Sequence, residues 1–482
     1  MVRAIAAAPA RLVPITLAAA SLAATPPLAA AFLPEGAFVL LVGSMTAGLL
    51  WLIRPSSLLW PILALVVAVS GVAPVLGAAI MLLGCVTLVA RQSGAFHPTV
   101  LLGAALSGYI LIGAPNISSY RGEVLPETTT VLLLAVVGIV AGCQLAAGSS
   151  RRTPSRKLIS GSAQVVALSF LPGLLGVAIL FAQAGLVLAD PARRFSASPL
   201  ALVLVETLTA SLALLCLHVY GDGLPPRRGQ VFAIFATVAL LASSGYRGFA
   251  IVAVAIVFFS RHFYGRHAIK PISLILVAFL AIGTMAGFDQ IRRATSGGAL
   301  IATETATVRY GAESLPNGFR QVHFALRESI AVTQRFITAE RVSADEPSLF
   351  WSDILTLMPG SQQSGGALVG EVVGRSQGGG ITPGAVGAVV YEFGRASPLF
   401  FIGLGAVTGL AWRRVEDSTT GPLVYFFAVV YTLHYMHRGI PKISYVLVPL
   451  AFVLFSRLWR ARTDSRIRVQ SQSATPSSSS NR

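Results

Sequence analysis

Three side chains between residues 319 and 341 could bind an anion together. The segment from Phe319 to about Arg341 has the apolar spacing of an amphipathic helix, and Arg320, His323 and Arg327 lie beside its apolar side within a sector of about 60°. Such a helix would lie on the membrane surface with this edge at the depth of the lipid headgroups. Because arginine binds phosphate and pyrophosphate with paired donors, the edge suits such a group. A solvated face that only anchors the helix to headgroups fits the pattern equally well.

A carboxylate lies inside one of the apolar segments of the chain. Glu206 is about seven residues, or roughly 10 Å, from the nearer end of its apolar segment. A carboxylate at that depth in a membrane is unfavourable unless it has a partner or a role. Glu206 could pair with an arginine such as Arg247, act as a base, or form an ion pair that is only structural.

Two further groups of polar residues stand at the ends of apolar segments. Glu392, in the segment Tyr391–Arg395, could accept a proton from a sugar hydroxyl or could cap the helix that follows. His434 and His437 are three residues apart and precede Arg438. A third metal ligand is not apparent, so hydrogen bonding or contact with a phosphate fits these histidines better than metal binding. The sequence contains no nucleotide-binding loop, Ser-His-Asp order or metal motif.

The composition predicts the elements that must hold these residues. Hydrophobic residues make up 54% of the 482 and charged residues 11%, whereas a soluble domain carries about a quarter charged residues. A membrane-spanning helix needs roughly 20 apolar residues. Candidate segments are 13–33, 37–53, 58–73, 75–91, 97–114, 129–148, 163–189, 199–219, 229–243, 246–260, 270–288, 397–412, 422–437 and 441–458. The first of them also resembles a signal peptide.

Lysine and arginine in the short loops predict the orientation of these segments. With both termini in the cytoplasm, the inner segments carry the whole net charge of +17, so the charge indicates topology and argues against a nucleic-acid partner. Residues 289–395 then form one large extracytoplasmic loop with nine arginines, no lysine and ten carboxylates. The sequence predicts helices over 1–288 and 396–458 and a disordered cytoplasmic tail over 459–482. The whole is an all-α, multi-pass protein of the cytoplasmic (inner) membrane.

Several of these segments resemble one family of membrane proteins, the O-antigen polymerases or oligosaccharide repeat-unit polymerases (Wzy-type). The resemblance covers about residues 200–450 and rests on five segments, which are Ser243–Gly248, Arg292-Arg293, Trp351–Pro359, Pro383–Gly394 and Arg438-Gly439. They resemble, in order, the family's Ser-Gly-x-Arg-Gly, the arginine that starts its large loop, an apolar run ending in Ile-Pro, its Gly-Glu-Leu-Tyr-x-Asn-Phe-Gly, and a late Arg-Gly.

The chain also departs from the family pattern. Ala388 stands where the family tends to have glutamate, Val390 where it has tyrosine and Glu392 where it has asparagine. The lysine that often follows the proline is absent near Pro359. A base cannot therefore be carried over to position 388, and Glu392 or His323 would have to take its place if a base is needed.

The resemblance implies a metal-independent membrane glycosyltransferase with a GT-C-like fold of about 12–14 transmembrane helices. It would polymerise polyprenyl-pyrophosphate-linked repeat units into a surface or capsular polysaccharide, without a cofactor, beside the flippase and chain-length regulator of the same pathway. The pyrophosphate ligands that the resembling segments supply are Arg247, Arg292, Arg293 and Arg438, and Arg320 and Arg327 of the amphipathic helix are added to them as candidates. His323, Glu392 or Glu206 would be the base.

Three other functions compete with this interpretation. An O-antigen ligase-like transferase shares the loop and the arginines but gives the glycan to a different acceptor. A transferase that uses polyprenyl-phosphate monosaccharides usually has an acidic pair in its first outer loop, where this chain offers only Glu35. A polysaccharide or lipid transporter would want polar residues along a path through the membrane, and only Glu206 qualifies.

Overall fold

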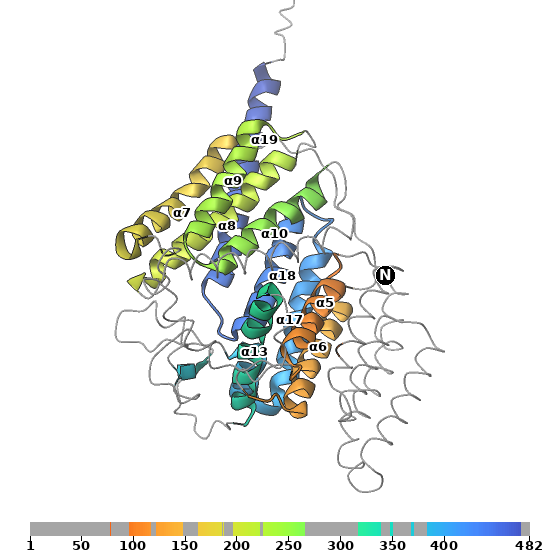
Figure 1. Ribbon diagram of the computed structural model, residues 1–482. Coiled ribbons are helices and arrows are strands. Elements are labelled where there is room, and N and C mark those ends of the chain that lie inside the picture. The colour runs from red at the N-terminus through yellow and green to blue at the C-terminus, as the bar shows by residue number, and fades with distance from the viewer. Residues whose placement is uncertain are drawn as a thin grey trace, which may run out of the picture. The chain divides into compact units, whose positions relative to one another are not determined.

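The protein is built from helices throughout the part that the computed structural model describes (Figure 1). The described residues are 78, 96–116, 122–147, 162–185, 187, 196–221, 225–265, 317–338, 348–349, 368–370 and 383–473. Their helices are α5 (Pro98–Gly113), α6 (Pro126–Ala147), α7 (Ala163–Ala184), α8 (Pro199–Tyr220), α9 (Arg228–Ser243), α10 (Arg247–Tyr264), α13 (Asn317–Thr338), α16 (Gly384–Phe393), α17 (Ser397–Arg413), α18 (Gly421–Arg438) and α19 (Ser444–Ser473). No strand occurs in these ranges, which confirms the all-α prediction for them.

The lengths and apolar character of these helices are those of a membrane protein. Helices α6, α7 and α8 each have 22 residues and are apolar enough to cross a bilayer. Shorter apolar helices include α5, α9, α16, most of α10 and the first part of α19. The apolar segments predicted before residue 96 and at 270–288 lie outside the described residues.

Local sequence explains where several helices begin and end. Helices α5 and α8 each start with proline, whose fixed φ suits a first helical position. The preceding His97 and Ser198 cap these helices, and the Ser198 hydroxyl accepts a hydrogen bond from the Ala201 N–H at 3.2 Å. Helix α18 ends at Gly439, whose φ of 77° is in the left-handed region that glycine adopts without strain.

Two compact units make up the chain, and α6 packs on α17 within the first. This unit contains α5, α6 and the part of α17 up to Ala406. A Cβ atom at Gly142 of α6 would collide with the carbonyl oxygen of Ile402, and one at Gly405 of α17 would collide with that of Ile139. Glycine therefore lets the two backbones touch, as small residues do between membrane helices.

Substituting leucine for Gly142 should destabilise the first unit, because a side chain there has to push α17 away. We expect a loss of about 3 kcal/mol, at the upper end for an overpacked interior. The measurement is thermal unfolding of the purified protein in detergent. Gly108→Leu in α5 is the matched control, since a Cβ there meets nothing within 4 Å. Equal losses for the two variants would mean that the α6–α17 contact is not important for stability.

The second unit is organised around α8, which packs against α7, α9, α10 and α19. Figure 1 shows α7 to α10 in yellow and green beside the blue α19. Gly173 and Gly176 of α7 allow a close approach, because a Cβ at Gly176 would lie 2.5 Å from the backbone nitrogen of Val205. This contact fixes the turn of α8 that carries Glu206.

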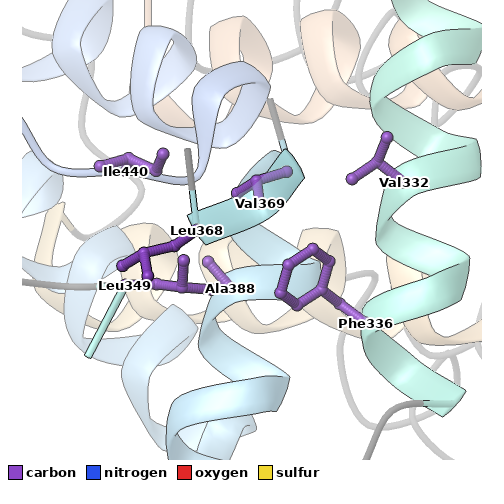
Figure 2. Close-up of a cluster of buried hydrophobic side chains, with 7 residues drawn as sticks. All are labelled: Val332, Phe336, Leu349, Leu368, Val369, Ala388 and Ile440. Atoms are coloured by element: carbon purple, nitrogen blue, oxygen red, sulfur yellow. The ribbon is translucent and has the colours of Figure 1, made fainter. Parts of the chain in front are cut away.

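Helix α13 also belongs to the second unit, where it packs against α16 and α18. It contributes Val332 and Phe336 to a cluster of buried residues drawn in Figure 2, which are Val332, Phe336, Leu349, Leu368, Val369, Ala388 and Ile440. Tyr391 packs against the cluster with its ring edge-on to Phe336. The helix expected over 319–341 is thus Asn317–Thr338, and Val322 and Ile330 of its apolar side are buried within the protein.

Two further boundaries differ from the sequence-based expectation. Residues 384–393, expected within the large loop, form α16, and its first six residues are buried. The run is too short to span a membrane, but it is long enough to fill a space between other helices. Helix α19 continues to Ser473, so the tail expected to be disordered from 459 begins as helix. Residues 474–482 lie outside the described range.

Candidate functional site

Glu206 is the eighth residue of α8 and faces α18 and the start of α19. Its side chain is buried, with 5% exposed. The carboxyl group interacts electrostatically with Lys442 and Arg438, and the hydroxyl groups of Ser444 and Tyr431 lie beside it. We call these five residues the Glu206 cluster. They place a carboxylate, two cations and two hydroxyl groups together inside an otherwise apolar bundle.

The two hydroxyl groups of the cluster lie near the carboxyl group without a hydrogen bond of standard geometry to it. Ser444 and Tyr431 are buried, with 1% and 6% exposed. Each is close enough to Glu206 to interact with it. Neither hydroxyl makes a hydrogen bond of standard length and angle to a residue in the described ranges. Buried polar groups normally have partners, so both hydroxyls remain able to donate to an anionic group in the cluster.

The two cations of the cluster flank the turn between α18 and α19. Arg438 is the last residue of α18, and Lys442 follows four residues later. Both side chains are half-buried, so they are accessible from the end of the bundle whereas Glu206 is not. Sequence reasoning paired Glu206 with Arg247, whose side chain lies outside the described part. It missed Lys442, although a lysine at the end of an apolar segment, in a chain with three lysines, was a usable signal.

The histidines of α18 connect the cluster to its neighbours. The ring of His434 lies 5.4 Å from that of Tyr445 and interacts electrostatically with Arg438 and Lys442. A Cβ atom at Gly248, in the first turn of α10, would lie 3.6 Å from Cε1 of His434. The start of α10 therefore lies close to α18 at His434.

Helix α13 fixes the end of α18 from the other side. The Ser329 hydroxyl donates to the carbonyl oxygen of His437 at 3.0 Å, and the Thr333 hydroxyl donates to that of Pro383 at 2.7 Å. Gly384, with φ of 65°, contacts the backbone at Gly439. The chain segments around Gly248, Gly384 and Gly439, which carry much of the family resemblance, thus meet near Arg438.

Two residues of the arginine and histidine edge expected on α13 are buried within the protein. Arg327 and His323 are fully buried. The Nη2 group of Arg327 donates to the side-chain oxygen of Asn116 and to the carbonyl oxygen of Gly122, so the guanidinium joins a distant part of the chain to α13. The side chain of Arg320 lies outside the described part. These hydrogen bonds favour a structural role for Arg327.

Glu392 occupies a separate position at the end of α16. Its side chain is half-buried, and Oε1 accepts a hydrogen bond from the Ser348 hydroxyl at 3.0 Å. The carboxylate also interacts electrostatically with Tyr435 of α18. Arg292 and Arg293 lie outside the described residues. Of the predicted site residues, the structure therefore brings Glu206 and Arg438 together and places Glu392 against the same helix.

Comparison with known proteins finds no matching family model, no matching curated protein and no matching solved structure. Any assignment of function therefore depends on the chemistry of these side chains and on the sequence resemblance described above.

Proposed function

We propose that this protein is a membrane glycosyltransferase that polymerises polyprenyl-pyrophosphate-linked oligosaccharide repeat units. The observation that supports the proposal is the Glu206 cluster, which combines a buried carboxylate with two partly accessible cations. The cluster lies at the ends of α8, α18 and α19 that the charge pattern places outside. A pyrophosphate-linked donor needs positive charge at this depth, and an acceptor hydroxyl needs a base.

The reaction assigns a role to each charged group. The oxygen of an acceptor hydroxyl attacks the anomeric carbon at the reducing end of the donor glycan, and a new carbon–oxygen bond forms. The bond from that carbon to the pyrophosphate oxygen breaks, and polyprenyl pyrophosphate leaves with the electron pair. Arg438 and Lys442 stabilise the negative charge that develops on it. The hydroxyl proton passes to a carboxylate, for which Glu206 and Glu392 are the candidates.

The proposal also covers the membrane topology and the partners of the protein. The protein has about 12–14 transmembrane helices in a GT-C-like arrangement, spans the inner membrane with both termini in the cytoplasm, and acts on the outer face. The remaining candidate ligands for pyrophosphate are Arg247, Arg292, Arg293 and Arg320. Its partners are the lipid-linked oligosaccharide, the bilayer, and the flippase and chain-length regulator of the same pathway.

Deletion of the gene in its native host tests this function. We expect single repeat units on polyprenyl pyrophosphate to accumulate and the surface polymer to disappear, because units that are not joined stay on their lipid. Gels and mass spectrometry of the lipid-linked glycans measure both effects. Full-length polymer that accumulates on the lipid would indicate the ligase-like alternative or a transporter. Unchanged glycans would remove the support for a glycosyltransferase.

A further inference from the structure

Two hydroxyl groups of α13 lie one turn apart and hold two other helices by their backbones. Ser329 and Thr333 are both fully buried. The Ser329 hydroxyl donates to the carbonyl oxygen of His437 at 3.0 Å, near the end of α18, and the Thr333 hydroxyl donates to that of Pro383 at 2.7 Å, just before α16. Because residues four apart lie on one side of a helix, the same side of α13 contacts the end of α18 and the start of α16.

Glycine allows the three helices to meet at this point. A Cβ atom at Gly384 would lie 2.9 Å from Oγ of Ser329 and 2.8 Å from Oγ1 of Thr333, and one at Gly439 would collide with the carbonyl oxygen of Gly384. Both glycines have a positive φ, 65° and 77°, which a residue with a side chain adopts only with strain. The backbone that follows Arg438 is therefore fixed by direct contact with Gly384.

The hydrogen bond from Ser329 acts on the peptide group that joins His437 to Arg438. The last carbonyl groups of a helix lack partners within the helix, and α18 ends at Arg438. Ser329 supplies a donor to one of these groups. Because a peptide group is planar, a fixed carbonyl oxygen also fixes the nitrogen and Cα atoms of Arg438, from which its side chain extends. Without this donor the peptide plane is free to rotate, and the guanidinium at the end of a long side chain is displaced furthest.

We infer that Ser329 is a positioning residue, which sets the direction of the Arg438 side chain so that its guanidinium binds a diphosphate group with paired hydrogen bonds. This inference rests on the proposed function, in which Arg438 binds the pyrophosphate of the donor. The planar guanidinium must face two oxygen atoms at once to form such a pair. A lysine ammonium in the same place is a point charge on a flexible stem, so its binding depends much less on the direction of the backbone.

The test is binding of inorganic pyrophosphate to the purified full-length protein in lipid nanodiscs, measured by calorimetry at constant ionic strength. Ser329→Ala should bind pyrophosphate about fivefold more weakly than the native protein, because a small misplacement of a binding group is costly. The same change in an Arg438→Lys background should leave the affinity within about twofold of that background. A serine that only supports the fold would weaken binding equally in both backgrounds. Equal weakening, or unchanged binding by Ser329→Ala alone, would overturn the inference.

Thr408→Val is the matched control. Thr408 of α17 shares a buried hydrogen bond of 3.2 Å with Thr432 of α18, so its replacement also removes a hydroxyl contact to α18, but away from the end that carries Arg438. Pyrophosphate binding should be unchanged. Weaker binding by this variant as well would mean that any loosening of α18 disturbs the site, and would overturn a specific role for Ser329.

A second substitution at the same position keeps the test decisive if Ser329→Ala does not fold. Ser329→Cys nearly preserves the size of the side chain, but a thiol is only a weak donor. Binding of pyrophosphate should then weaken by about threefold, again only in the presence of Arg438. Unchanged binding by this variant would overturn the inference.

Failure of this inference can be distinguished from failure of the proposed function. Accumulation of single repeat units in the deletion strain tests the function and does not depend on Ser329. Weakening by Ser329→Ala that disappears in the Arg438→Lys background, together with unchanged glycans in that strain, would support the positioning role and reject the polymerase. Loss of polymer in the strain, together with equal weakening in both backgrounds, would do the reverse. A native protein that binds no pyrophosphate would overturn the inference and remove Arg438 from the proposed reaction.

Discussion

Replacing Arg438 by glutamine should abolish polymer formation while the amount of protein in the membrane stays the same. We expect a fall in polymer yield of about a hundredfold or more, as when a charge-stabilising donor is removed from an active site. The fold should survive because the end of α18 is held through its backbone, by the hydrogen bond from Ser329 to the carbonyl oxygen of His437 and by the turn at Gly439. Polymer on gels and protein on immunoblots of a complemented deletion strain measure the two quantities.

Arg335→Gln is the matched control for this prediction. Arg335 lies in the last turn of α13 with its side chain exposed. The expected topology places it on the same, extracytoplasmic side of the membrane as Arg438, so its replacement removes one positive charge from that side. Polymer should be normal in this variant. If both variants make normal polymer, Arg438 is not part of a pyrophosphate site. If both lose it, the effect comes from net charge and not from the Glu206 cluster.

The helices and one half of the site could be predicted from the sequence. Long apolar segments predict helices wherever they meet the length of a bilayer, and the described helices between residues 97 and 264 begin and end near the expected positions. Glu206 is conspicuous because a carboxylate inside such a segment is rare. Its partner Lys442 is harder to recognise, because it lies in a turn distant in sequence and resembles a residue that only marks the end of a span.

The environment of α13 could not be predicted for a related reason. The spacing of its apolar residues shows that one side of the helix must be covered, but it does not show whether lipid or protein covers it. The covering helix α16 is only ten residues long and therefore lay within the expected loop. The burial of Arg327 depends on Asn116 and Gly122, which belong to a different part of the sequence. No local pattern connects them.

Replacing Arg327 by methionine distinguishes a structural role of this side chain from a role in binding pyrophosphate. Methionine keeps most of the length of the side chain but leaves the oxygen atoms of Asn116 and Gly122 without their donor. A buried polar group that loses its partner costs about 1–3 kcal/mol. We expect a protein that unfolds at lower temperature in detergent and is less abundant in the membrane.

The same variant gives a different result if Arg327 binds pyrophosphate instead. In that case the protein would be as abundant and as stable as the native chain, and only polymer would be lost. Arg335→Met is the control, because Arg335 lies eight residues further along the same helix with its side chain exposed, and its replacement should change neither stability nor polymer. Arg327→Lys adds a second comparison. It keeps the positive charge but cannot reproduce the planar donor group, so a structural role predicts partial loss of stability, whereas a role in charge alone predicts recovery of polymer.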